Sequence, residues 1–106
     1  MTKPTGGEIV RERLLAEEVP YLVGIPRHEI VAMLDAFPTS QDQIKILQVR
    51  HEQSTVHLAD GYYRVAAKPL SVFTSIGPGA LNTAIGLGAS YVDSTAVLVL
   101  SGETHA

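Results

Sequence analysis

Apolar residues fall along this chain in two patterns that alternate with one another. In the first pattern they recur every three or four positions, which is typical of a helix with one buried face. We predict such helices over residues 8–18, 29–37, 52–66 and 78–91. In the second pattern mostly apolar residues run together, which is typical of a short strand covered on both faces. We predict strands over residues 21–25, 44–49, 70–74 and 96–100, and a loop over residues 38–42.

The alternation of strands with helices predicts an α/β fold. Strands joined by right-handed helical crossovers form an open parallel sheet, and their helices pack on both of its faces. We therefore expect a sheet of about four strands with helices on both faces. The chain has 106 residues, which is enough for one domain and short for two. We expect residues 1–106 to form a single domain.

Turn-forming and polar residues follow three of the predicted strands. Gly-Ile-Pro at residues 24–26 follows the first strand, Arg-His-Glu at residues 50–52 follows the second, and Gly-Pro-Gly at residues 77–79 follows the third. In open parallel sheets ligands bind at the carboxyl ends of the strands. The sequence therefore predicts a binding site at this edge of the sheet.

Taken together, these segments resemble those of thiamine diphosphate-dependent enzymes. Residues 24–26 resemble the Gly-x-Pro turn after the first strand of that family, and residues 50–62 resemble its glutamate helix. Residues 75–82 resemble its glycine turn, and Asp93-Ser94 also fits. The match runs through most of the chain and is closest to the acetolactate synthase and 2-oxo-acid decarboxylase branch. The resemblance implies the N-terminal pyrimidine-binding domain, or most of it.

The resemblance gives Glu52 the leading catalytic role. In the family the matching glutamate hydrogen-bonds the ring nitrogen N1′ of the cofactor's aminopyrimidine and shares a proton with it. A partly buried carboxyl with a raised pKa suits that task, so we expect a raised pKa for Glu52. From its position alone, Glu52 is also an ordinary acidic residue in the first turn of a helix, where it favours the helix dipole.

The other site residues follow from the same resemblance. The cofactor-binding set that it implies is Glu52, Gly24, Pro26, Ser75, Gly77, Pro78, Gly79 and Asn82. His28 follows the Gly-x-Pro turn, and the family often places a substrate-facing polar residue there. As a second catalytic residue His28 could transfer protons or bind a carboxylate, and the alternative is an exposed loop histidine. His51 and His57 do not share a helix face, so we expect no metal ligands.

Two residues depart from the family's pattern. Arg27 stands where the family commonly has glycine, and it brings a bulky cation to the edge of the cofactor site. Glu18 stands where a glycine often ends the first helix. If either position requires a positive φ, a residue other than glycine costs about 1 kcal/mol there.

Composition limits the partners. The net charge of −3 favours neither nucleic acid nor an anionic membrane surface, and no apolar run is long enough to span a bilayer. The absence of cysteine fits a reducing compartment, and we expect a cytoplasmic protein. The Gly-Asp-Gly…Asn segment, with which the family holds magnesium and diphosphate, does not occur in the sequence. The resemblance thus implies thiamine diphosphate as cofactor, with Mg²⁺ held by a diphosphate-binding domain that is absent here.

Two functional hypotheses follow, and a third is weaker. The first is a segment of an enzyme that decarboxylates or ligates 2-oxo acids. It would be inactive alone, form a homo-oligomer and work with the diphosphate-binding domain of a partner subunit. The alternative is a non-catalytic binding or assembly module that retains the fold. A flavodoxin-like regulator or nucleotide binder would leave Glu52 without a role.

Overall fold

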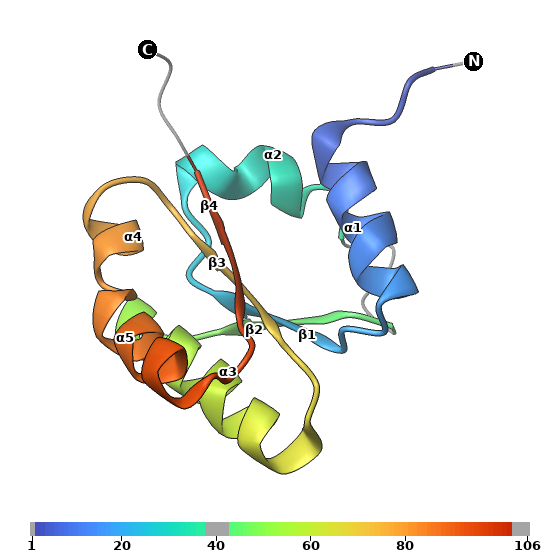
Figure 1. The fold of residues 1–106 in the computed structure, drawn as a ribbon. Coiled ribbons are helices and arrows are strands. Elements are labelled where there is room, and N and C mark those ends of the chain that lie inside the picture. Colours follow the sequence, from blue (N-terminus) through green and yellow to red (C-terminus); the bar gives the residue numbers. More distant parts are fainter. Residues whose placement is uncertain (1, 38–42, 103–106) are drawn as a thin grey trace.

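The computed structural model describes residues 2–37 and 43–102, and the predicted loop at residues 38–42 lies outside these ranges. Within them the chain forms a four-stranded parallel sheet with helices on both faces (Figure 1), which confirms the predicted α/β class. The strands are β1 Tyr21–Gly24, β2 Lys45–Gln48, β3 Ser71–Thr74 and β4 Leu98–Ser101. The helices are α1 Gly6–Ala16, η1 His28–Ile30, α2 Val31–Leu34, α3 Glu52–Ala66, α4 Pro78–Leu81 and α5 Ala84–Asp93.

The strand order is β2-β1-β3-β4, so the chain changes direction across the sheet. From β1 it moves outward to β2, and it then returns past β1 to form β3 and β4. The crossover helices α3 and α5 therefore lie on the face opposite α1 and α2 (Figure 1). Such a reversal between two adjacent strands leaves a crevice at their carboxyl ends, which is where open α/β sheets bind ligands. Here the reversal lies between β1 and β3.

Each face of the sheet has its own core because side chains along a strand alternate between faces. Leu22 and Phe73 are buried with α1 and α2, whereas their neighbours Val23 and Val72 are buried with α3. The central strands β1 and β3 are thus covered on both sides. This explains why their sequences lack alternating polar residues. No helix of the described chain is long and apolar enough to cross a membrane.

Helix α3 begins at Glu52 and ends at Ala66, as predicted. Its first turn is capped by His51, whose Nδ1 accepts a hydrogen bond from the Gln53 backbone N–H at 3.0 Å. A side-chain acceptor at this position satisfies one of the N–H groups that the helix leaves unpaired. The cap fixes Glu52 as the first helical residue, after the short segment that follows β2.

The predicted helix over residues 78–91 is divided in two. Helix α4 ends at Leu81 and α5 begins at Ala84, with Asn82 and Thr83 between them. The Thr83 hydroxyl donates to the Ala80 carbonyl at 2.6 Å. A threonine hydroxyl that bonds a nearby carbonyl competes with the helical hydrogen-bond ladder, which accounts for the break. The break directs Asn82 toward Glu52.

Candidate functional site

A cleft of about 360 Å³ lies at the carboxyl ends of the strands. It is formed by segments that follow β1, β2 and β3, so it coincides with the reversal point of the sheet. The residues that line it are Arg27, Glu52, Ser75, Ile76, Pro78, Gly79 and Asn82. The structure therefore brings together five residues of the predicted cofactor-binding set, namely Glu52, Ser75, Pro78, Gly79 and Asn82.

Glu52 is the buried carboxylate of this cleft, with 6% of the residue exposed. Its Oε1 accepts a hydrogen bond of 3.0 Å from Asn82 Nδ2. Its Oε2 lies on the side of Gly79, 3.5 Å from the place where a Cβ on that glycine would stand. The carboxylate is thus fixed by an amide on one side and faces a position without a side chain on the other.

The expected raised pKa of Glu52 is wrong. The Asn82 amide is the largest influence and lowers the pKa below its ordinary value, against burial, which raises it. The Glu52 backbone N–H and the charges of His51 and Arg27 lower it further. Hydrogen bonds and nearby cations favour a charged carboxylate, and here they outweigh desolvation. At neutral pH the cleft therefore presents an ionised acceptor.

The glycine turn before α4 has two different requirements for glycine. Gly77 has φ +59° and ψ −123°, a conformation that side chains rarely adopt. Gly79 is needed for space, because a Cβ there would lie 2.7 Å from Ser75 Oγ. Pro78 occupies the first turn of α4, as predicted, where its missing N–H costs nothing. The turn thus brings Gly79, which has no side chain, to the wall of the cleft.

Gly24, Pro26 and His28 do not line this cleft. Gly24 ends β1, and a Cβ there would lie 2.4 Å from the Phe73 carbonyl oxygen, so packing alone explains the glycine. Pro26 is exposed. His28 is also exposed and opens η1. Roles for these residues in binding or catalysis stay predictions.

Arg27 and Ile76 line the cleft although neither belonged to the predicted set. The strain considered for Arg27 does not arise, because its backbone is extended at φ −136° and ψ 160°. The signal for Arg27 was present in the sequence as a cation beside the Gly-x-Pro turn. Ile76 gave no comparable signal, since an isoleucine before a glycine turn is an ordinary apolar residue.

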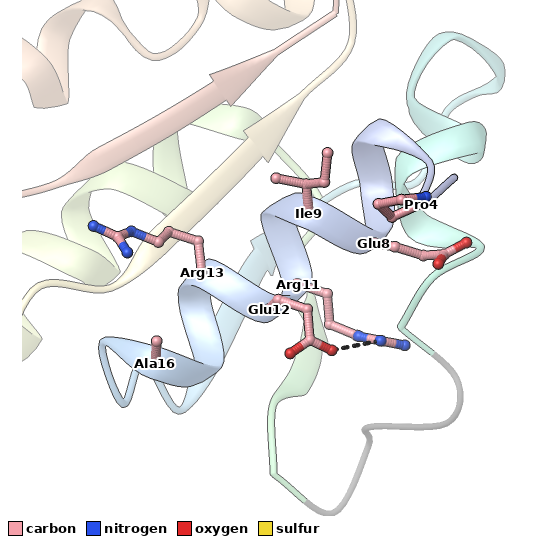
Figure 2. A pocket seen from close by; sticks show the side chains of 7 residues that line it. All are labelled: Pro4, Glu8, Ile9, Arg11, Glu12, Arg13 and Ala16. Atoms are coloured by element: carbon pink, nitrogen blue, oxygen red, sulfur yellow. Dashed lines mark hydrogen bonds and ion pairs between the residues drawn. The ribbon is translucent and has the colours of Figure 1, made fainter. Parts of the chain in front are cut away.

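A second hollow, of about 470 Å³, runs along α1 (Figure 2). Its lining comes from that helix and the preceding Pro4. Acidic and basic side chains alternate along it, and Arg11 pairs with Glu12 at 2.7 Å while Arg13 points elsewhere (Figure 2). The hollow contains none of the predicted site residues. It is the charged flank of one helix, and the cleft at Glu52 is the better candidate.

Comparisons with known proteins agree with this geometry. The family model for the N-terminal TPP-binding domain of thiamine pyrophosphate enzymes matches residues 4–106. The chain belongs to this family. Thiamine pyrophosphate is another name for thiamine diphosphate, so the family suggested by the sequence motifs is confirmed.

Several relatives are large subunits of acetolactate synthase. That of Haemophilus influenzae is 39% identical over 103 residues, covering 97% of this chain and 18% of the relative. Isozyme 3 of Escherichia coli is 36% identical over 99 residues, covering 93% of this chain and 17% of the relative. A protein of Pseudomonas aeruginosa named "probable 2-ketoarginine decarboxylase" is 36% identical over 101 residues, covering 95% of this chain and 18% of the relative. The chain spans less than a fifth of the length of these relatives.

The cleft fits the aminopyrimidine half of the family's cofactor. A flat ring whose nitrogen can be protonated fits a carboxylate acceptor beside a position without a side chain. Glu52 supplies the acceptor, and Gly79 keeps open the space beside it that a Cβ would fill. In the described part of the chain, no cluster of three or more His, Cys, Asp or Glu side chains could hold a metal ion.

Proposed function

We propose that this chain binds the aminopyrimidine of thiamine diphosphate and serves an acetolactate synthase-like enzyme that decarboxylates or ligates 2-oxo acids. The observation that carries the proposal is the ionised, buried Glu52 carboxylate, held by Asn82 and facing Gly79 within one cleft. When bound, the cofactor supplies the carbon nucleophile that attacks the carbonyl group of a 2-oxo acid. The chain's own contribution is to orient the ring and to hold a proton on it.

The lowered pKa of Glu52 suits a carboxylate that accepts rather than donates. At neutral pH, Glu52 is ionised and accepts a hydrogen bond from a protonated ring nitrogen, which stabilises positive charge on the ring. Asn82 prevents the carboxylate from rotating away, because its amide already occupies Oε1. Glu52 thereby keeps the exchangeable proton at the ring nitrogen during the reaction.

The remaining cleft residues position the ring. Pro78 and Gly79 form one wall of the cleft, and the buried Ser75 lies next to Gly79. Gly77 lets the chain turn sharply after β3, so that α4 starts next to the carboxylate. Gly24 and Pro26 belong to the proposed set as residues that shape the turn after β1, and His28 as a second polar group beyond it.

We further propose that diphosphate and Mg²⁺ are held by a diphosphate-binding domain of a partner subunit, and that residues 1–106 form a single pyrimidine-binding domain that is inactive alone. The chain matches less than a fifth of its relatives, which leaves room in those proteins for such a domain. The acidic net charge of −3 also makes a nucleic acid an unsuitable partner. A cytoplasmic location stays a prediction that rests on the absence of cysteine.

Self-association is supported by the outer face of α4 and α5. Leu81 at the end of α4 and Ile85 and Val92 on α5 are large apolar residues that are 68–79% exposed. Large apolar side chains grouped on one surface indicate a protein contact. We propose that a second copy of the chain covers this face.

Ile85→Lys should shift sedimentation toward the monomer, whereas Ile9→Lys on α1, across the sheet, should not. Equal sedimentation of both variants would oppose the proposal.

The alternative is a non-catalytic module, which the departures at Arg27 and Glu18 and the short length of the chain would favour. Arg27 was expected to strain the backbone beside the site, and its extended conformation carries no such strain. Glu18 does have φ +57°, but it lies at the end of α1, away from the cleft. The remaining departure is therefore a matter of helix termination and has no bearing on the Glu52 carboxylate.

The test uses thiamine, which carries the aminopyrimidine without the phosphates. Thiamine should shift the backbone amide NMR signals of Gly77, Gly79 and Asn82 in a saturable manner. Glu52→Gln should weaken binding about tenfold, because it removes a charge-assisted hydrogen bond. Glu12→Gln on the exposed flank of α1 is the matched control and should bind like the original chain. Absence of saturable shifts in a folded chain would refute the proposed function.

A further inference from the structure

Arg27 places a positive charge in the cleft that contains Glu52. It follows β1, precedes η1, and lines the cleft with Glu52 and Ser75. Arg27 is an exposed residue whereas Glu52 is buried, so Arg27 lies nearer the mouth of the cleft and Glu52 lies deeper. Arg27 makes no ion pair or hydrogen bond with any side chain that the structure describes.

The two charges have different tasks in one cleft. Glu52 is already engaged by Asn82, and its remaining oxygen faces the glycine wall. Arg27 is close enough for its charge to act on Glu52, but the two are not an ion pair in the structure. A cleft with an anion inside and a cation at its mouth selects two ligand groups, of which one donates a hydrogen bond and the other is anionic. Arginine suits the second group because its planar guanidinium binds a carboxylate with two hydrogen bonds.

The volume of the cleft permits both groups. About 360 Å³ is within the range of small-ligand sites, roughly 300–1,000 Å³. Once a ring occupies the space beside Glu52 and Gly79, the part of the cleft at Arg27 and Ile76 is left for a small molecule. Ile76 offers an apolar surface there, and Arg27 offers the only positive charge among the residues that line this cleft in the described chain.

We propose that Arg27 is a specificity-determining residue that binds the carboxylate of a small 2-oxo acid at the mouth of the Glu52 cleft. The proposal rests on the proposed function for the identity of the acid. It does not depend on that function for the anion site itself.

The experiment titrates the chain with pyruvate, the simplest 2-oxo acid with an apolar substituent, with and without saturating thiamine. The signals observed are the side-chain Nε–H of Arg27 and the backbone amides of Ser75 and Ile76. Arg27→Gln should weaken pyruvate binding about tenfold, and Arg27→Lys should weaken it less, since lysine keeps the charge without the paired donors. Arg13→Gln, at an exposed arginine on α1, is the matched control and should change nothing.

Two further ligands identify the anion. Methyl pyruvate has the same size without the charge, so it should bind the original chain and the Arg27→Gln variant equally. Inorganic phosphate should compete less well than pyruvate. If pyruvate binds the original chain and the Arg27→Gln variant equally, Arg27 does not recognise the carboxylate and the proposal fails. If phosphate binds at Arg27 more tightly than pyruvate, the site is for phosphate and the proposal also fails.

The result separates this proposal from the proposed function. If the original chain does not bind thiamine, the proposed function of Glu52 is refuted. Even then, the anion site would be supported if pyruvate binds in the absence of thiamine and if that binding depends on Arg27. Conversely, thiamine binding that depends on Glu52, together with pyruvate binding that ignores Arg27, would keep the function and refute the role of Arg27.

Discussion

Asn82 Nδ2 donates a hydrogen bond of 3.0 Å to Glu52 Oε1, although the two residues lie 30 positions apart. The bond joins the segment between α4 and α5 to the first residue of α3. It exists because the helix over residues 78–91 is interrupted after Leu81, which turns the Asn82 side chain toward α3. A single amide therefore both fixes the position of the carboxylate and lowers its pKa.

The first prediction concerns the pKa of Glu52. Asn82→Ala should raise the pKa of Glu52. The substitution removes the hydrogen bond that lowers the pKa most, whereas burial, which raises the pKa, remains. A pH titration of the Glu52 carboxyl carbon by NMR measures the change. Gln53→Ala, which removes an amide from the next position of α3, should leave the Glu52 titration where it was. An unchanged titration in Asn82→Ala would show that the hydrogen bond is not made in solution.

The same bond predicts a pH-dependent stability. Because the pKa of Glu52 is lowered in the folded chain, its contribution is present above the ordinary value of 4.5 and is lost as pH falls through the folded value. Asn82→Ala should cost about 1.5–3 kcal/mol of unfolding free energy at pH 7, as expected for a hydrogen bond to a charged group. Urea unfolding should show this difference shrinking below pH 4.5. A difference that stays constant down to the lowest pH would contradict the assignment to Glu52.

A third prediction compares two glycines on α5. A Cβ at Gly86 would lie 2.7 Å from Val56 Cβ on α3, whereas a Cβ at Gly88 would meet nothing within 4 Å. Gly86→Ala should therefore destabilise the fold by about 1–3 kcal/mol, as overpacking does. Gly88→Ala should stabilise it by about 0.5–1 kcal/mol, because alanine has the higher helix propensity. Denaturant unfolding of both variants tests the close contact between α3 and α5, and effects of the same sign would argue against it.

Much of the fold was readable from the sequence because local patterns determine it. Helix α3 has its predicted bounds, since periodic apolar residues run through the segment and His51 caps its start. The strands are each present within one or two residues of the predicted positions. The strand order could not be read, because it depends on which buried faces pack together rather than on any one segment.

The site was predictable in its residue types and less so in its electrostatics. Glu52 and Gly79 share one cleft because both follow parallel strands, which a sequence pattern can indicate. The direction of the Glu52 pKa shift was not predictable, because it depends on Asn82, whose orientation follows from the helix break at Thr83. The sequence predicted a cation at the edge of the cofactor site in Arg27, and the structure adds that Arg27 lines the same cleft as Glu52 with an unstrained backbone.

Helix α1 ends in a conformation that its sequence does not favour, which gives a fourth prediction. Glu18 has φ +57°, and the backbone N–H of the following Val19 bonds the Leu14 carbonyl at 3.0 Å. Glycine adopts this conformation without penalty, so Glu18→Gly should stabilise the fold by about 0.5–1 kcal/mol. Glu17 has φ −87°, so Glu17→Gly should destabilise the helix end instead. Opposite shifts of the melting temperature in the two variants are the expected result, and destabilisation by Glu18→Gly would count against this helix ending.

The last prediction concerns Asp60, which joins α3 to the segment between α5 and β4. Its carboxylate accepts from the Thr95 hydroxyl, from Ser90 Oγ at 3.2 Å and from Arg64 Nε at 3.0 Å. Arg64 also pairs with Asp93 at 2.6 Å. The Thr95 hydrogen bond, followed by that of Arg64, lowers the pKa of Asp60 below its ordinary value of 3.8. The stability that Asp60 contributes is therefore present above pH 3.8 and is lost as pH falls through its folded value.

Two variants separate the charge of Asp60 from its hydroxyl partner. Asp60→Asn should reduce stability at neutral pH, and the loss should fade under acid because the original carboxylate is then protonated too. Thr95→Val keeps the charge and removes the largest cause of the lowered pKa, so the Asp60 carboxyl should titrate at a higher pH in that variant. Urea unfolding across the acid range and NMR titration measure these effects. If Asp60→Asn lost the same free energy at every pH, the network would act through shape rather than charge, because only an ionised carboxylate can produce a loss that disappears on protonation.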